Sequence, residues 1–271
     1  MRTAAALSLL GLCSCTSLTM AEPQIHVSPY LAVYQLRGTS SVQSEPSPGL
    51  VQDNRSQPMR TFGQDHHRED VGVRVDIGDG FGGFRADYYR LDMGTGGSGA
   101  LDADWGRLLA GDVVRMTADM DEVRVGYEEP LLDLETDFRD HPLRLRCAIG
   151  AVVAHRELNL RAATVDGVRQ QRLELEGDVA YPAVRARLSW REVSLDVDYA
   201  AAPDAFVLGG DWDGMQQDLE VRLAYTLPMR DVTFFGGYRY SEFPATGDAN
   251  GFRYDADLRL DGYQFGLVLT F

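Results

Sequence analysis

The chain has 271 residues, of which 44% are hydrophobic and 25% are charged, the ordinary balance of one or two folded domains. Its formal net charge of −15 argues against electrostatic binding of nucleic acid. Once a leader is removed only Cys147 remains of the three cysteines, which excludes an intramolecular disulfide framework. This composition does not exclude a membrane β-barrel, because only alternate residues of such strands face lipid.

The N-terminal segment is typical of an export signal. Arg2 supplies one positive charge, and an uncharged, leucine-containing stretch follows as far as Ala21. Small residues stand at the −3 and −1 positions, so we expect cleavage before Glu22 and a mature barrel domain over 22–271. Two alternatives stay open here: an uncleaved anchor helix, and a lipoprotein signal in which Cys15 is acylated.

After this segment, apolar and polar residues alternate with period two in many stretches, which is typical of β-strands. No later apolar run is long enough for a transmembrane helix. The alternation predicts ten strands near 24–37, 70–78, 81–92, 119–128, 142–163, 169–190, 193–201, 218–227, 231–242 and 252–271. Pro29 interrupts the first strand, and Pro182 marks a parity slip in the sixth strand, where we expect a bulge.

Short and long connections take turns along the chain. The short ones lie at 78–80, 191–192 and 228–230, and the long polar ones at 38–69, 93–118, 202–217 and 243–251. We expect two departures: a long connection over 129–141, and a tight outer hairpin at Asp166-Gly167. The pattern predicts an all-β, antiparallel up-and-down transmembrane barrel of about ten strands, with eight or twelve as alternatives and both termini periplasmic.

Aromatic residues favour a membrane barrel over a soluble β-sandwich or a periplasmic barrel, because they fall where two membrane interfaces would lie. Those near the short turns are Trp190 and Phe271, and those toward the long loops are Tyr88, Tyr199, Tyr238 and Tyr240. Arginine and aspartate in the middle of strands also fit a wet lumen better than a dry sandwich core.

The last nine residues carry the most specific motif. Every odd position is aromatic or aliphatic, namely Tyr263, Phe265, Leu267, Leu269 and Phe271. This resembles the C-terminal signature of bacterial outer-membrane proteins, which the barrel-assembly machinery recognises. The resemblance implies the outer membrane of a Gram-negative envelope, with membrane lipid, lipopolysaccharide and the assembly machinery as partners. It identifies no subfamily.

Charged residues on the predicted inner face suggest what the lumen contains. They form i, i+2 pairs at Arg74/Asp76, Arg85/Asp87, Glu122/Arg124 and Glu220/Arg222, a basic group at Arg144, Arg146, Arg185 and Arg187, and an acidic group at Asp196 and Asp198. We favour a salt-bridge network that plugs a narrow barrel with a structural or surface-interaction role. The alternative is a porin-like passive channel for small solutes, which would select anions along the arginine face.

An outer-membrane hydrolase is the least favoured alternative. Omptin-type proteases are similar in size, and they use an aspartate pair opposite an Asp-x-His pair. Here the only Asp-x-His, at 65–67, precedes the candidate pairs Asp102/Asp104, Asp211/Asp213 and Asp255/Asp257, which reverses the family's chain order. His155 lacks the neighbouring serine of lipid A deacylases, and loop 210–214 matches no calcium-loop spacing. We therefore predict no catalytic residue, no cofactor and no metal.

Overall fold

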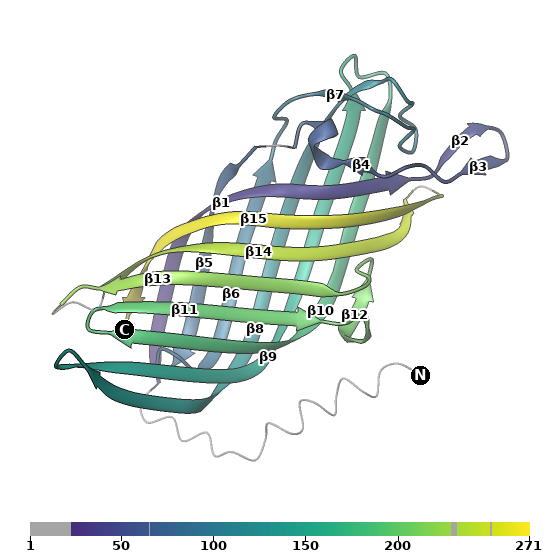
Figure 1. The fold of residues 1–271 in the computed structure, drawn as a ribbon. Helices are drawn as coiled ribbons and strands as arrows, with labels where there is room; N and C mark the ends of the chain where they lie inside the picture. The colour runs from purple at the N-terminus through teal and green to yellow at the C-terminus, as the bar shows by residue number, and fades with distance from the viewer. Residues whose placement is uncertain (1–22, 65, 229–231, 250) are drawn as a thin grey trace.

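The computed structural model describes residues 23–64, 66–228, 232–249 and 251–271, and it is built almost entirely of strands (Figure 1). The predicted leader lies outside this part of the chain. None of the described helices is long and apolar enough to cross a membrane. Ten long antiparallel strands form the wall: β1 Gln24–Val42, β5 Arg68–Gly78, β6 Gly83–Met93, β8 Val113–Phe138, β9 His141–Thr164, β10 Gln170–Trp190, β11 Val193–Ala202, β13 Gln216–Thr226, β14 Val232–Ala249 and β15 Phe252–Thr270.

The wall closes into a ring, which confirms the predicted up-and-down barrel. Each strand pairs with its neighbour in the chain, β10 pairs with β11, and β15 pairs with β1 to close the seam. At one end, Ile25 and Phe271 exchange backbone hydrogen bonds, and the short turns lie at this same end. We call it the turn end and the opposite one the loop end.

Short elements decorate the loop end. They are the strands β2 Ser44–Ser47, β3 Leu50–Gln52, β4 Gln57–Pro58, β7 Gly99–Ala100 and β12 Val207–Gly210, with the 3-10 turns η2 Met59–Phe62 and η3 Asp204–Phe206. Two of the connections fold back onto the barrel: Phe62 and Trp105 are fully buried with ring centroids 5.0 Å apart. The indole Nε1 of Trp105 donates to Ser40 Oγ at 3.1 Å, so these segments cap the interior.

The outer surface divides the barrel into two zones. Toward the turn end, outward side chains are apolar and form a belt on all ten strands: Leu31, Val73, Phe84, Val125, Ile149, Val184, Leu195, Leu223, Phe234 and Phe265. Toward the loop end the outward side chains are polar instead. On β9 the outward residue changes from Val153 to His155, and on β15 from Tyr263 to Asp261.

The inward side chains change in the opposite direction, from charged within the belt to apolar toward the loop end. Inside the loop-end zone lies a packed hydrophobic core, which includes Tyr34, Leu36, Leu91, Met116, Leu158, Leu173, Leu175, Phe243, Leu258 and Leu260. Burying a leucine or phenylalanine side chain stabilises a fold by roughly 2 kcal/mol. The packed core therefore stabilises the loop-end zone of the barrel. Inside the belt many of the residues are charged.

Two sequence predictions about strands are wrong. No bulge occurs at Pro182, because β9 and β10 stay in one register through Pro182↔Ala151, and residues of odd number face inward along all of β10. What changes along β10 is the kind of residue that faces inward, from Leu173 to Arg185. The apparent parity slip is this reversal of polarity.

The connection predicted over 129–141 is a strand hairpin. β8 and β9 stay paired past Glu129, with a bulge at Leu131, and turn at Arg139 and Asp140, whose φ angles are 51° and 63°. Two successive residues of positive φ form the tight turn that suits twisted hairpins. The alternation of Leu132 and Leu134 with acidic residues lets the strands continue beyond the barrel wall.

Candidate functional site

Charged side chains fill the interior at the level of the apolar belt. The arginines are Arg74, Arg85, Arg124, Arg156, Arg185, Arg187, Arg222 and Arg239, and the acids are Asp76, Asp87, Glu122, Glu128, Asp196, Asp198, Asp218 and Glu220. We call this set the lumen charge network. It contains eight of each kind, so its formal charges cancel. The belt side of each strand faces outward, and strand alternation therefore turns these residues inward.

The part of the network nearest the loop end centres on Glu122, whose side chain is 0% exposed. Its carboxylate accepts hydrogen bonds from Arg156 Nε at 2.6 Å and Arg239 Nη2 at 2.6 Å, and Arg124 Nε lies 3.4 Å away. Asp218 forms ion pairs with two of these arginines, at 3.0 Å from Arg124 Nη1 and 3.1 Å from Arg239 Nη2. Two carboxylates and three guanidinium groups thus form one buried cluster.

The middle of the network is organised by Arg74. Its guanidinium makes a paired contact with both oxygens of Glu220, at 2.9 and 2.8 Å, and donates to Asp87 at 2.9 Å. The Tyr30 hydroxyl donates to the other oxygen of Asp87 at 2.8 Å, and Arg222 Nε lies 3.0 Å from Glu220. Because Arg74 and Glu220 lie on β5 and β13, this contact crosses the lumen rather than following one sheet edge.

Toward the turn end, the network ties β5 and β6 to β10 and β11. Arg85 lies 2.8 Å from Asp76 and 3.3 Å from Asp198. Asp196 accepts from Arg185 Nη2 at 3.2 Å and Arg187 Nε at 2.7 Å. These contacts place carboxylates between arginines that would otherwise repel one another.

A phenylalanine closes the turn end of the network. The β5–β6 turn, residues 79–82, folds Phe81 inward until it is only 2% exposed. The guanidinium carbons of Arg146, Arg185 and Arg187 lie 4.5, 5.1 and 5.4 Å from its ring centroid, within the range of cation–π contacts. Arg185 and Arg187 also donate to the carbonyls of Phe81 and Gly80 at 2.8 and 2.7 Å. These contacts hold the turn inside the turn-end opening of the barrel.

Little space remains within the network. A cavity of about 40 Å³ lies among Arg85, Arg124, Glu128, Asp198 and Glu220. A water molecule needs about 10–15 Å³ by this measure, so the cavity has room for only a few. The hydrophobic core lies on the loop-end side of this cavity, and Phe81 lies on its turn-end side.

The structure brings most of the predicted lumen residues together, but by different pairings. Arg74 and Asp76 do not pair with each other; Arg74 contacts Asp87 and Asp76 contacts Arg85, because these residues are directly opposite across β5 and β6. Opposed residues on neighbouring strands are closer than i, i+2 residues on one strand. The pairs Glu122/Arg124 and Glu220/Arg222 do form contacts within their own strands.

One predicted lumen residue lies elsewhere. Arg144 belongs to the exposed part of the β8–β9 hairpin and pairs there with Asp133, because the hairpin carries it past the barrel mouth. Arg146 lies at the mouth, paired with Asp79 and stacked on Phe81. Four network residues were missed: Glu128, Arg156, Asp218 and Arg239. Their inward parity was the available signal.

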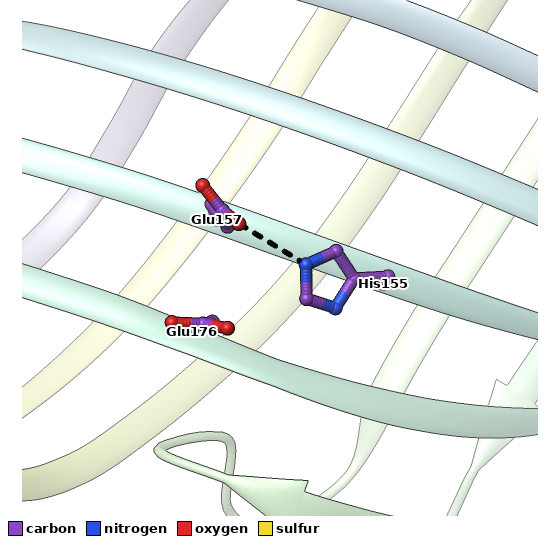
Figure 2. Close-up of side chains that lie close together, drawn as sticks. All are labelled: His155, Glu157 and Glu176. Atoms are coloured by element: carbon purple, nitrogen blue, oxygen red, sulfur yellow. Dashed lines mark hydrogen bonds and ion pairs between the residues drawn. The ribbon is translucent and has the colours of Figure 1, made fainter.

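A second group of side chains lies on the outer wall (Figure 2). His155 Nδ1 lies 2.9 Å from Asp178 and Nε2 lies 3.2 Å from Glu157, while Glu176 is directly opposite Glu157 on β10. Among the described residues, His155, Glu157 and Glu176 are the one group of three whose possible ligand atoms lie within 4.8 Å of one another. The carboxylates raise the pKa of His155, which lies just outside the belt. His155 thus makes two exposed ion pairs, and two carboxylates, Glu157 and Glu176, are directly opposite each other beside it.

Two of the aspartates weighed as hydrolase candidates, Asp104 and Asp211, accept hydrogen bonds from the backbone. Asp65 lies outside the described residues. Asp104 accepts the backbone N–H of Ala110, and Asp211 accepts that of Glu176. The pair Asp255/Asp257 lies on β15, with Asp257 facing a groove on the outer wall.

Comparison with known proteins gives the fold and no closer relationship. No protein-family model and no curated protein sequence matches the chain. The outer membrane protease OmpT from Escherichia coli is similar in structure, with a TM-score of 0.55 and 10% identity over 95% of this chain and 99% of that one. A Pseudomonas aeruginosa FadL homologue has a TM-score of 0.34 at 8% identity, over 93% of this chain and 90% of that one. The likeness to OmpT shows that the chain has the fold of an outer-membrane β-barrel.

Proposed function

We propose that this protein is an integral outer-membrane barrel whose lumen is closed, with a structural or surface-interaction role rather than a transport or catalytic one. The charge balance of the lumen charge network is the observation that carries this. Each buried arginine has a carboxylate partner within 4.0 Å, so the interior is cross-linked and electrically neutral. A channel that selects anions needs unpaired positive charge along an open path.

The two-zone architecture supports the surface role. In a membrane the apolar belt would face lipid, and the loop-end zone, with its polar wall and hydrophobic core, would stand outside as a rigid cylinder. In this arrangement the short turns and both termini are periplasmic, and the long connections are extracellular. Membrane lipid, lipopolysaccharide and the barrel-assembly machinery are the expected partners.

The first test is whether the chain forms a membrane barrel. We expect unboiled protein in detergent to migrate differently from boiled protein on a denaturing gel, because the closed strand network resists detergent until heated. Cell fractionation should recover the protein with outer membranes. Recovery in the soluble periplasmic fraction, with no heat-dependent shift, would contradict the proposal.

The second test is conductance across a planar bilayer. We expect refolded wild-type protein to give no steady current, since the network and Phe81 fill the lumen. Replacing both Arg185 and Arg187 with serine should produce frequent openings, because this removes the contacts to Asp196 and releases Phe81. It should also lower the free energy of unfolding by roughly 3 kcal/mol, since Asp196 would be left without a partner.

The matched control replaces two exposed arginines of the outer wall, Arg90 and Arg172, with serine. This variant removes the same formal charge and should stay closed. A large, steady, anion-selective current from the unmodified protein would overturn the closed barrel in favour of the narrow channel.

A further inference from the structure

Four side chains on the outer wall, two from β9 and two from β10, form a compact group just outside the belt. His155 and Glu157 are two residues apart on β9, so strand alternation turns both outward. On β10, Asp178 is directly opposite His155. Glu176 is directly opposite Glu157, and Figure 2 shows these two carboxylates beside the imidazole. Beyond Asp178 the next strand, β12, presents Gly209, which has no side chain to cover the group.

The separations within this group suit a metal ion. Nitrogen and oxygen ligands lie about 2.0–2.2 Å from Zn²⁺, so two ligand atoms of a tetrahedral site stand roughly 3.4 Å apart. His155 Nε2 already lies 3.2 Å from Glu157 Oε1. A carboxylate oxygen of Glu176 completes a set of three possible ligand atoms that all lie within 4.8 Å of one another. Because the Glu176 side chain is exposed, rotation about its own bonds can close the remaining distance.

Asp178 orients the imidazole as a ligand. His155 Nδ1 lies 2.9 Å from Asp178 Oδ1, and an ionised carboxylate can only accept a hydrogen bond, so Nδ1 carries a proton. A carboxylate behind the ring is the arrangement that fixes the tautomer and the orientation of histidines that bind metals. The other nitrogen, Nε2, faces Glu157, and a lone pair facing a carboxylate is repelled by it. A cation therefore belongs between them, either a proton or a metal ion.

The group carries more negative charge than its own cation can balance. Three carboxylates surround one imidazole, and within the described part of the chain no arginine forms an ion pair with any of them. In the same part of the chain, the carboxylate of Glu176 makes no hydrogen bond or ion pair. Asp121 of β8 is directly opposite Glu157 on its other side. Like charges directly opposite across strands destabilise a sheet, and a divalent ion would relieve this repulsion.

We propose that His155, Glu157 and Glu176 bind one divalent transition-metal ion of the Zn²⁺ type, with Asp178 holding the imidazole through Nδ1. One nitrogen and two oxygen ligands favour such an ion over Ca²⁺, which takes six to eight oxygen ligands. The ion joins β9 to β10 from outside, and water completes its coordination on the exposed wall. The proposal is independent of whether the lumen conducts. The sequence predicted no metal, because the ligands come from two strands whose register only the fold supplies.

Isothermal titration calorimetry of the untagged, refolded full chain tests this site after bound metal has been removed with a chelator. The probes are ZnCl₂ and CaCl₂. We expect one Zn²⁺ per chain, and Ca²⁺ to bind at least roughly tenfold more weakly because one of the three ligands is a nitrogen. Equal affinity for the two ions would indicate an acidic surface that attracts any divalent cation, and would overturn the proposal. Absence of Zn²⁺ binding would overturn it as well.

Two variants remove one ligand each, His155→Ala and Glu176→Gln. Each should lower Zn²⁺ affinity at least roughly tenfold, since loss of even an outer partner of a metal ligand costs about that much. The matched controls are His141→Ala, at the start of β9, and Glu174→Gln, an exposed carboxylate two residues from Glu176 on the same face. Both controls should keep the wild-type affinity. Unchanged affinity in the ligand variants, or equal losses in the controls, would overturn the proposal. The heat-dependent gel shift shows whether each variant still forms the barrel.

The positioning role of Asp178 has its own test. Asp178→Ala removes the acceptor for Nδ1 and should lower Zn²⁺ affinity roughly tenfold. Asp178→Asn keeps an oxygen that accepts from Nδ1, so it should recover most of this loss. Equal losses in the two variants would contradict a role through this hydrogen bond. Saturating Zn²⁺ should also raise the temperature of the gel shift in the wild type, because it binds only the folded barrel. An equal rise in His155→Ala would place the ion elsewhere and overturn the site.

Discussion

Replacing Glu122 with alanine is expected to lower the free energy of unfolding by about 3–5 kcal/mol, because removal of one partner leaves buried charge uncompensated. The Glu122 carboxylate is fully buried among Arg124, Arg156 and Arg239. Asp218 alone would then face three guanidinium groups inside a wall that excludes lipid and solvent. The loss should appear as a lower urea midpoint when folding into liposomes is followed by the gel shift.

Two substitutions calibrate this result. Glu122→Gln keeps the volume and one acceptor oxygen, so it should cost less than the alanine variant. Glu174→Ala removes an exposed ion-pair partner of Arg172 on the outer wall, and surface pairs contribute at most about 1 kcal/mol. If Glu122→Ala cost no more than Glu174→Ala, the lumen charge network could not be what holds the belt zone together.

The belt zone could be predicted from sequence because each of its strands has one apolar and one polar face. Along 71–77 and 219–227 the alternation alone assigns Val73 and Leu223 to the outside and Arg74 and Arg222 to the inside, as the structure has them. The ring of ten strands follows from counting such segments. Nothing more than period-two alternation and the rhythm of connections was needed.

The loop-end zone could not be predicted in the same way, because its alternation has the opposite sense. On β10 the inward residues are Leu173 and Leu175 beyond the belt and Arg185 within it, although all have the same parity. If each strand is expected to have one apolar face, this reversal is mistaken for a bulge or for the start of a loop. For that reason β1, β8 and β14 continue further toward the loop end than predicted.

The ion pairs across the lumen could not be predicted from the sequence either. Parity shows that Arg239 faces inward, but its contact with Glu122 depends on how β14 and β8 face each other across the barrel. Arg156 was missed for a further reason: it is a single inward charge between the outward residues His155 and Glu157, with no i, i+2 partner to draw attention to it.

The second large effect is expected at the last residue. Phe271 is 75% exposed, and its backbone exchanges hydrogen bonds with Ile25 at the β1–β15 seam. Tyr263 and Phe265 face outward in the same strand, so the C-terminal motif presents one continuous apolar edge. Near the membrane interface a single acidic residue costs at most about 1 kcal/mol, so Phe271→Asp should leave the stability of refolded protein nearly unchanged.

The same substitution should affect assembly in cells much more strongly than it affects stability. If the terminal aromatic residue is what the barrel-assembly machinery recognises, Phe271→Asp should reduce surface levels at least roughly tenfold while export to the periplasm continues, and purified variant should still refold in vitro. The matched control is Phe138→Asp, because Phe138 is also an exposed aromatic residue, 46% accessible, at the tip of the β8–β9 hairpin. Quantitative surface labelling of the two variants measures the difference. Normal surface levels of Phe271→Asp, or equal losses in both variants, would show that the terminal residue acts only as one more apolar side chain.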